Sequence, residues 1–154
     1  MHTPRLISVL ALGLGLLATG CMMQESKPAP ANAMASSNTL YARLGGMPAI
    51  NAVVDDFTNR VATDPELNAG FKNADVPKFK KNLADQICEA TGGPCKYAGK
   101  NMKEAHKGMK ITDAQFNKTG GHLAASLDKF NVAAADKNAL LNAIGGMKPD
   151  IVNQ

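Results

Sequence analysis

A single histidine lies on an apolar face of the segment from residue 101 to residue 109 of this 154-residue chain. If that segment is helical, Met102, Ala105, His106 and Met109 follow the spacing i, i+3, i+4 and i+7, which places them on one face. Neutral imidazole is a preferred ligand for iron, and methionine packs well against flat aromatic rings. His106 is therefore a candidate metal ligand. The alternative is a core histidine satisfied by a hydrogen bond within the protein.

Two cysteines offer a second kind of chemistry. Cys88 and Cys95 flank the sequence Gly92-Gly93-Pro94, a turn that can fold the chain back on itself. Paired thiols of an exported protein tend to become disulfides, so we predict a bond between these two residues. Two free buried thiols are the alternative.

Export is indicated by the start of the chain. The apolar run from Leu6 to Leu17 is short for a membrane span, and the small residues Ala18-Thr19-Gly20 follow it directly before Cys21. We expect residues 1–20 to be a lipoprotein-type signal peptide, with Cys21 lipidated. An ordinary signal peptide with cleavage nearby is the alternative. The predicted location is the periplasm or outer membrane, with membrane contact through the lipid anchor only.

The rest of the chain divides into a linker and one domain. Residues 21–37 are rich in Pro, Ala, Ser and Asn without apolar periodicity, which predicts a flexible linker. Residues 38–154 are long enough for a single domain. The formal net charge is only +4, and no aromatic residues interleave with the scattered lysines, so we expect no nucleic-acid partner.

The domain is predicted to be all-α, because no segment alternates convincingly enough to be a strand. Helices are expected from Asn38-Thr39 to Gly45-Gly46, from Pro48 to Asp64-Pro65, from Asp75 to Gly92-Gly93, around His106, from the capping box Thr112–Gln115, and through Leu140, Leu141 and Ile144 to Gly145-Gly146. A short turn with Leu67 and Phe71 separates the second and third helices. The long helix after Thr112 should turn Phe116, Leu123, Leu127 and Phe130 inward.

The order of these landmarks resembles the truncated haemoglobins, in particular group I. The matching residues are Leu40 to Gly46, Phe57, Arg60-Val61, Phe71, Gly92-Gly93, Lys96 to Gly99 and Met102 to Lys107. The resemblance implies a truncated globin, a two-over-two helical sandwich around haem, with His106 as the proximal iron ligand and Phe71 packed on the haem face. No C-x-x-C-H sequence is present, so we expect non-covalent haem b.

Composition independently favours a bulky cofactor. Aromatic residues make up only 5% of the chain, there is no Trp, and many inward positions are Ala or Gly. A large flat apolar cofactor would fill the resulting shortfall of core. A marginally stable helical domain with close helix contacts is the alternative. The family resemblance and the helix faces together imply these haem-contacting residues: Phe57, Thr58, Phe71, Phe79, Asn82, Leu83, Met102, His106, Met109 and Phe116.

The distal side departs from the family. Group I members usually carry a Tyr directly after the residue matched by Phe57, and this chain has Thr58 there. Counted back from Gly92-Gly93, the usual Gln positions fall on Phe79 and Leu83, and Asn82 lies where some members place a histidine. The resemblance therefore implies an apolar distal pocket, with Thr58 and Asn82 as the nearby donors and weak retention of oxygen.

Three further side chains carry open alternatives. His122 lies on the next helix, where the surface is favoured over the haem edge, and reaching the opposite haem face is not expected. Lys78 and Lys103 are candidates to pair with the two haem propionates, with solvated lysine as the alternative for each.

The leading functional hypothesis is a haem protein that reversibly binds oxygen, nitric oxide or carbon monoxide, rather than an enzyme. The alternatives are a haem enzyme for nitric oxide detoxification or peroxide chemistry, and a haem-free helical lipoprotein. No distal His or Arg occupies the matched positions, which disfavours peroxidase chemistry. No nucleotide-binding fingerprint is present, so iron reduction would require a partner protein.

Overall fold

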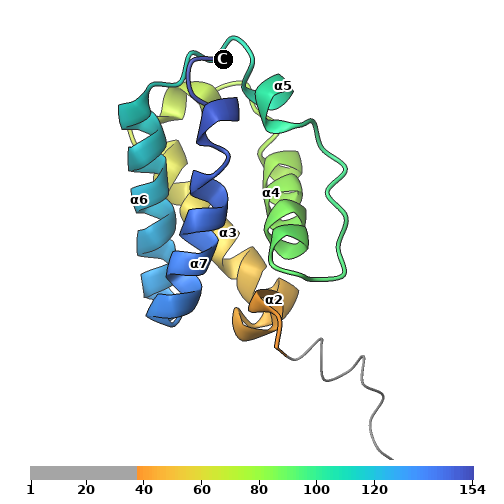
Figure 1. The fold of residues 1–154 in the computed structure, drawn as a ribbon. Helices are drawn as coiled ribbons and strands as arrows, with labels where there is room; N and C mark the ends of the chain where they lie inside the picture. Colours follow the sequence, from red (N-terminus) through yellow and green to blue (C-terminus); the bar gives the residue numbers. More distant parts are fainter. Residues whose placement is uncertain (1–37) are drawn as a thin grey trace, which may run out of the picture.

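The computed structural model describes residues 38–154, and these residues form helices without a β-strand (Figure 1). The α-helices are α2 (Leu40–Arg43), α3 (Gly46–Thr63), α4 (Val76–Ala90), α5 (Met102–His106), α6 (Asp113–Lys129) and α7 (Ala134–Gly145), with 3-10 helices η1 (Asn68–Phe71) and η2 (Lys148–Asp150). A single β-bridge joins Ile111 to Val152 within this part of the chain. The predicted signal peptide, Cys21 and the linker lie outside the described residues.

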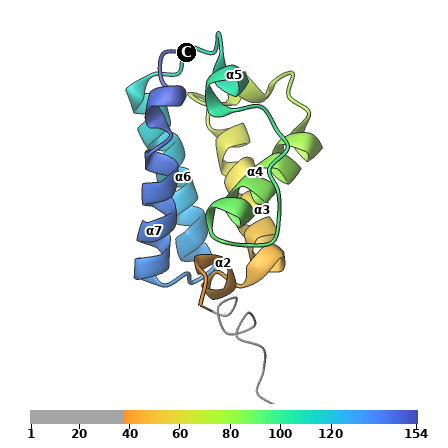
Figure 2. The ribbon, with the colours of Figure 1, turned by 45° about the vertical axis from the view of Figure 1, so that its right-hand side comes forward.

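Two helix pairs make up the domain. α3 packs against both α4 and α6, and α6 packs against α7, while short α5 contacts η2 (Figures 1 and 2). This is the predicted all-α, two-over-two arrangement. No helix of residues 38–154 is long and apolar enough to cross a membrane.

Local capping explains where the helices begin. The Thr39 side chain accepts a hydrogen bond from the Ala42 amide (3.2 Å), and Asp75 accepts one from Lys78 (3.0 Å). The predicted capping box at the start of α6 is present, with Thr112 and Gln115 bonded reciprocally. These side chains satisfy amides that have no partner within their own helix.

The turn after α4 depends on its glycines. Gly92 has a φ of 83°, and a Cβ at Gly93 would lie 2.6 Å from the Tyr41 ring and 2.8 Å from the Cys88 carbonyl oxygen. The turn brings Cys88 and Cys95 to a Cα separation of 5.8 Å, with their sulfur atoms at bonding distance. This geometry is what the predicted disulfide requires.

The fully enclosed core lies where α3, α4, α6 and α7 meet. Val54, Leu127 and Leu140 are each 1% exposed. The inward orientation expected for Phe130 is wrong: this side chain is 40% exposed. Because α6 ends at Lys129, Phe130 lies past the last turn and leaves the apolar face of the helix.

Candidate haem-binding site

His106 is the last residue of α5, and a hydrogen bond fixes its ring. Nδ1 lies 2.7 Å from the carbonyl oxygen of Met102, four residues earlier. A carbonyl only accepts, so in the neutral ring Nδ1 carries the proton and Nε2 keeps its lone pair. No described residue hydrogen-bonds Nε2, and the side chain is half-buried. The imidazole is thus prepared to bind iron, as the second hydrogen bond of metal-binding histidines usually ensures.

The predicted helix from residue 101 to residue 109 is too long. α5 begins after Asn101, whose side chain accepts from the Glu104 amide (2.9 Å), and ends at His106. Gly108 has a φ of 82°, and Met109 closes a turn onto the His106 carbonyl (3.0 Å). Met109 is 52% exposed, so its assignment to the His106 face is wrong.

Apolar side chains of four elements, all of them predicted haem contacts, remain half-buried. Phe71 of η1 and Phe79 of α4 meet edge to face, with ring centroids 5.0 Å apart. Leu83, Met102 and Phe116 are also neither enclosed nor exposed. Apolar surface left partly open by the protein's own packing is what a flat apolar cofactor would cover. These residues fit haem.

Phe57 and Thr58 are placed differently from the other predicted haem contacts. Their exposures are 6% and 1%, so surrounding side chains already enclose them. The Thr58 hydroxyl donates to the Val54 carbonyl oxygen at 2.6 Å, within α3. A hydroxyl has a single hydrogen to donate, so Thr58 offers no donor to the pocket in this arrangement.

Gln86 belongs to this region and was missed by sequence reasoning. Its Nε2 lies 3.4 Å from the sulfur of Met102 and 3.5 Å from that of Met147, bridging α4 to α5 and the segment after α7. Gln86 follows Phe79 by seven positions and Leu83 by three, which is the spacing of one helix face. That spacing was available in the sequence, but a polar residue does not stand out in an apolar repeat.

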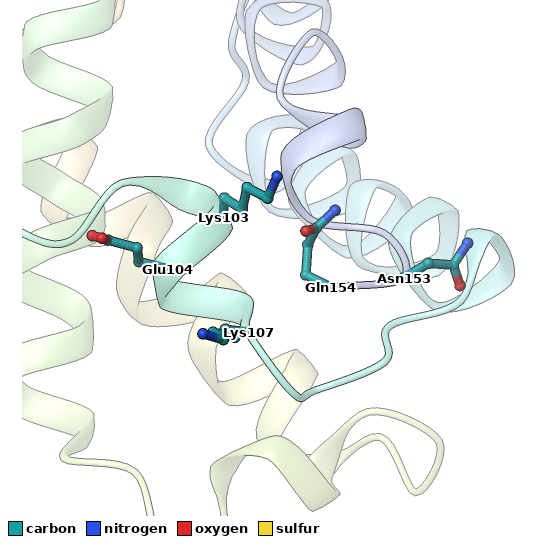
Figure 3. Close-up of a pocket in the computed structure, with 5 residues that line it drawn as sticks. All are labelled: Lys103, Glu104, Lys107, Asn153 and Gln154. Atoms are coloured by element: carbon teal, nitrogen blue, oxygen red, sulfur yellow. The ribbon is translucent and has the colours of Figure 1, made fainter.

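The two predicted propionate partners, Lys78 and Lys103, line different clefts. A cleft of about 330 Å³ is lined by Lys78 and Asn82 of α4, by residues 97–100 and by Ala105 of α5. Lys103 instead lines a cleft of about 350 Å³ together with Glu104, Lys107, Asn153 and Gln154 (Figure 3). The structure thus brings Lys78 together with Lys100, not with Lys103.

Residues 97–100 are held firmly at the first cleft. The Tyr97 hydroxyl donates to the Lys100 carbonyl oxygen (2.6 Å), and burial raises the pKa of this phenol. The Glu89 carboxylate accepts from the Tyr97 amide (3.0 Å) and from Lys96 Nζ (3.1 Å). Both contacts lower the Glu89 pKa.

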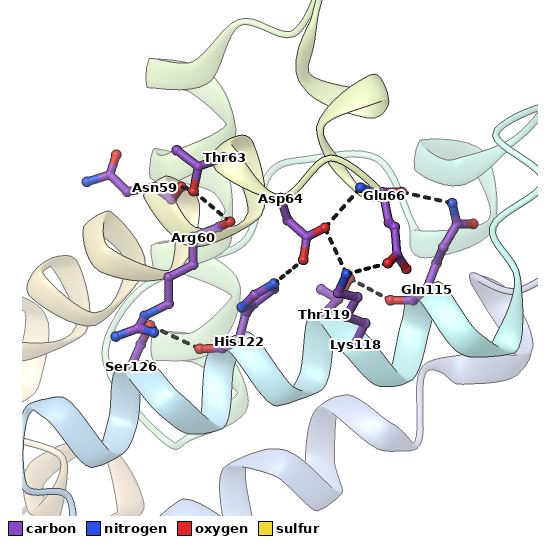
Figure 4. Close-up of polar contacts among 10 residues, drawn as sticks. All are labelled: Asn59, Arg60, Thr63, Asp64, Glu66, Gln115, Lys118, Thr119, His122 and Ser126. Carbon is purple, nitrogen blue, oxygen red and sulfur yellow. Dashed lines mark hydrogen bonds and ion pairs between the residues drawn. The ribbon is translucent and has the colours of Figure 1, made fainter.

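His122 lies away from these clefts, in a polar cluster at the end of α3 (Figure 4). Its Nε2 is 2.8 Å from Asp64 Oδ2, and Lys118 Nζ is 2.9 Å from Asp64 Oδ1. Hydrogen bonds from His122 and Lys118 lower the Asp64 pKa to about 2. His122 is half-buried and does not line either cleft. Its partner Asp64 lies 58 positions earlier in the chain, and this contact was not predicted from the sequence.

An imidazole held ready for iron, beside apolar walls that the protein does not close, is a feature of haem proteins. Two helix pairs enclosing such a site form the abbreviated globin arrangement. The site and the fold together define the chain as a globin.

Comparisons with known proteins agree. The sequence profile of bacterial-like globins matches residues 39–153. A group 1 truncated haemoglobin of Tetrahymena pyriformis is 35% identical over 121 residues, covering 79% of this chain and all of the relative. One from a Nostoc species is 33% identical over 117 residues, covering 76% of this chain and 99% of the relative.

Solved structures are similar as well. The T. pyriformis protein in its Fe(III) form superposes with a TM-score of 0.73, covering 75% of this chain and 99% of that structure. The 2/2 haemoglobin of Synechococcus sp. PCC 7002, which has covalently attached haem, gives 0.70 at 28% identity, covering 75% of this chain and 99% of that structure. The chain belongs to the bacterial-like globin family, among the group I truncated haemoglobins, and is a haem-binding globin.

Proposed function

We propose that this globin reversibly binds a diatomic gas, oxygen, nitric oxide or carbon monoxide, at a haem iron held by His106. The observation that carries the proposal is the 2.7 Å contact between His106 Nδ1 and the Met102 carbonyl oxygen, which leaves Nε2 available. When bound, the haem supplies the iron and one open coordination position for the gas. The protein supplies the orientation of the imidazole and an apolar enclosure.

The haem is proposed to be haem b, held without covalent bonds. Thioether attachment uses free cysteine thiols, and the sulfur atoms of Cys88 and Cys95 contact each other instead. The imidazole of His122 faces Asp64. Among the described residues, neither of these usual attachment groups is directed at the cofactor.

Lys78 and Lys100 are proposed to hold the haem propionates. Both line the cleft between α4 and α5. Helix α4 carries the predicted distal residues, and α5 carries His106. Neither forms a salt bridge with a described carboxylate, so both charges are available to an anionic group. The backbone contact of Tyr97 fixes the position of Lys100. Lys103 lines the other cleft, so Lys100 replaces it as the proposed propionate partner beside Lys78.

The distal side is proposed to hold gases without a strong hydrogen-bond donor. The Thr58 hydroxyl is committed to Val54, and Phe79 and Leu83 are apolar. Asn82 lines the same cleft as Lys78 and Lys100, which we call the propionate cleft. This arrangement favours carbon monoxide relative to oxygen, because polarised oxygen gains more from a donor than carbon monoxide does.

Export and lipid anchoring through Cys21 are part of the same proposal. They rest on the signal-like residues 1–20 and on the small residues before Cys21. A gas-binding protein in that compartment requires a partner to reduce its iron, because this chain has no nucleotide-binding fingerprint.

The test is the His106→Ala variant, purified with haem supplied and compared with His122→Ala. We expect His106→Ala to lose the iron-ligand absorption bands and most of its haem. His122→Ala should keep both, since its imidazole contacts Asp64 and not the apolar walls. Unchanged spectra and haem retention in His106→Ala would refute the assignment.

A further inference from the structure

We propose that the surface formed by Lys103, Lys107 and Lys110 docks an acidic electron-donor protein. We call these three residues the α5 lysine surface. The inference rests on the proposed haem function and names the kind of partner that reduces the iron. One electron passes from the partner's reduced centre to ferric iron, so the partner is oxidised and the iron becomes ferrous, without a bond or a proton being transferred.

The charges of the α5 lysine surface are unpaired. Nine other described cations form salt bridges with carboxylates: Arg43, Arg60, Lys80, Lys81, Lys96, Lys118, Lys129, Lys137 and Lys148. Outside the surface, Lys72, Lys78 and Lys100 form none among the described residues, and Lys78 and Lys100 line the cleft proposed for the propionates. The three lysines of the surface are exposed, and none forms a salt bridge with a described residue. Glu104 is the one carboxylate in residues 100–110. Positive charge that the fold leaves uncompensated here is available to an acidic partner.

A cleft and one exposed apolar side chain belong to the same surface. Lys103 and Lys107 line the cleft of about 350 Å³ between α5 and residues 153–154 (Figure 3). Met109, 52% exposed, lies between Lys107 and Lys110 in the chain. An exposed methionine among lysines suits a transient interface, in which charge guides the approach and one soft side chain makes contact.

Position favours an electron donor. Lys103 and Lys107 flank His106 in the chain, so a partner bound there would lie beside the helix that carries the proposed iron ligand. A partner docked here would therefore reach the iron through α5 itself, without crossing the helix pairs.

Position also favours a protein over a lipid surface. The described chain begins at α2, and α5 lies at the opposite end of the molecule (Figure 1). A tether attached before residue 38 therefore leaves the α5 lysine surface directed away from the anchored end. Binding to anionic lipid becomes an outcome that the experiment must separate.

The experiment measures reduction of the ferric haem protein by two small probes of opposite charge at low ionic strength. Lys103→Gln/Lys107→Gln is expected to slow reduction by the anionic iron(II)–EDTA complex about five-fold and to accelerate reduction by hexaammineruthenium(II), because the local potential falls. The matched control is Ala135→Glu/Asn138→Glu, which makes the same change in net charge at exposed positions near α2. We expect less than about two-fold change with either probe for this control.

A binding measurement completes the test. Isotope-labelled haem protein carrying Cys21→Ser, which prevents lipid attachment, is titrated with a deca-glutamate peptide by NMR. Shifts confined to amides of residues 100–110, and lost in Lys103→Gln/Lys107→Gln, support the proposal. Equal rate changes with both probes, or no change, overturn it. Tighter binding to phosphatidylglycerol vesicles than to the peptide also overturns it, by assigning the surface to lipid.

The two proposals fail in different ways. If the protein does not take up haem, or if its spectrum is independent of His106, the proposed function fails before either probe is used. If haem uptake and the spectrum are normal but the reduction rates do not depend on the charge of the probe, only the docking proposal fails.

Discussion

Two polar side chains near the haem region make the same local bond with opposite consequences. His106 and Thr58 each bond to the carbonyl four residues earlier in its helix, that of Met102 and Val54 respectively. Imidazole has a second nitrogen, so the bond orients it and leaves a ligand atom free. A hydroxyl has one hydrogen, so the bond removes its donor. One side of the pocket is thereby prepared to bind iron, and the other loses a polar contact.

At the scale of single residues, we predict that the native protein releases oxygen fast. We also predict that a hydrogen-bond donor introduced on the distal side slows this release. Leu83→Gln places an amide at a half-buried position of α4, where the family usually has one. A hydrogen bond of about 1.4 kcal/mol would slow oxygen dissociation roughly ten-fold if the association rate is unchanged. Stopped-flow dissociation kinetics measure this directly. Leu83 is preferable to Thr58→Tyr, because Thr58 is 1% exposed and a phenol ring would overpack the site.

The control for this prediction is Thr58→Val. Since the Thr58 hydroxyl already donates to Val54, its loss should leave the oxygen dissociation rate within about two-fold of the native value. A slow native rate that increases sharply in Thr58→Val would show that the hydroxyl reorients toward the gas. A slow native rate that Thr58→Val leaves unchanged would point to Asn82.

The placement of residues was predictable where a local pattern defines it. His106 stands out as the one imidazole on an apolar face, and its neighbour Met102 follows from helical spacing. Met109 was assigned wrongly because Gly108 breaks the helix one turn early, and glycine within a helical pattern is an ambiguous signal. The bond between His122 and Asp64 joins distant segments, and no local rule predicts such contacts.

At the scale of elements, the Asp64 cluster fastens the end of α3 to α6. The turn that follows Asp64 leads into η1, which carries Phe71 of the apolar wall. Glu66 extends the cluster, since Lys118 Nζ is 2.9 Å from its carboxylate as well. The cluster therefore positions the segment that carries Phe71 without belonging to the apolar wall itself.

We predict that Asp64→Asn lowers the free energy of unfolding at neutral pH, and that the deficit shrinks in acid. The Asp64 pKa falls from 3.8 to about 2 on folding, so its stabilisation is complete above about pH 4 and is lost as the pH falls toward 2. Urea unfolding of the haem-free protein at pH 7 and pH 3 measures the difference. Asp150→Asn removes an exposed carboxylate that forms no salt bridge among the described residues, and it is the matched control.

The pairing of Cys88 with Cys95 is a second prediction at this scale. The bond would tie the end of α4 to the loop that leads to Tyr97 and Lys100 at the propionate cleft. For a short loop we expect a stabilisation of about 2–3 kcal/mol. Intact mass before and after alkylation of protein taken from the periplasm tests the bond. Two alkylatable thiols would contradict it, and Cys88→Ala/Cys95→Ala measures its contribution to stability.

Helix boundaries were largely predictable because side-chain caps are local. Thr39, Asp75 and Thr112 each bond to an amide three residues later, a spacing visible in the sequence. Phe130 was assigned wrongly because the pattern does not show that α6 ends at Lys129. Where a helix ends depends on the chain it meets next, and that is a tertiary property.

At the scale of the whole molecule, the core is divided. Fully enclosed apolar residues gather where α3, α4, α6 and α7 meet, and Phe71, Phe79 and Leu83 at the edge of this core remain half-buried. Aromatic content of only 5% leaves little else to close that region. Half-open apolar surface stabilises the folded state less than enclosed surface, since water still reaches it.

We therefore predict that haem contributes a large part of the stability of the domain. A ligand that binds only the folded state stabilises it by RT ln(1 + [L]/Kd), about 4 kcal/mol at roughly a thousand-fold excess over Kd. The melting temperature of the haem-free protein should lie well below that of the haem protein, and a His106→Ala variant supplied with haem should fall between them. Circular dichroism melts of the three forms provide the comparison. Equal melting temperatures would mean that the half-open apolar surface closes on itself without haem, with Gln86 and its two methionine contacts holding α4 to α5 in its place.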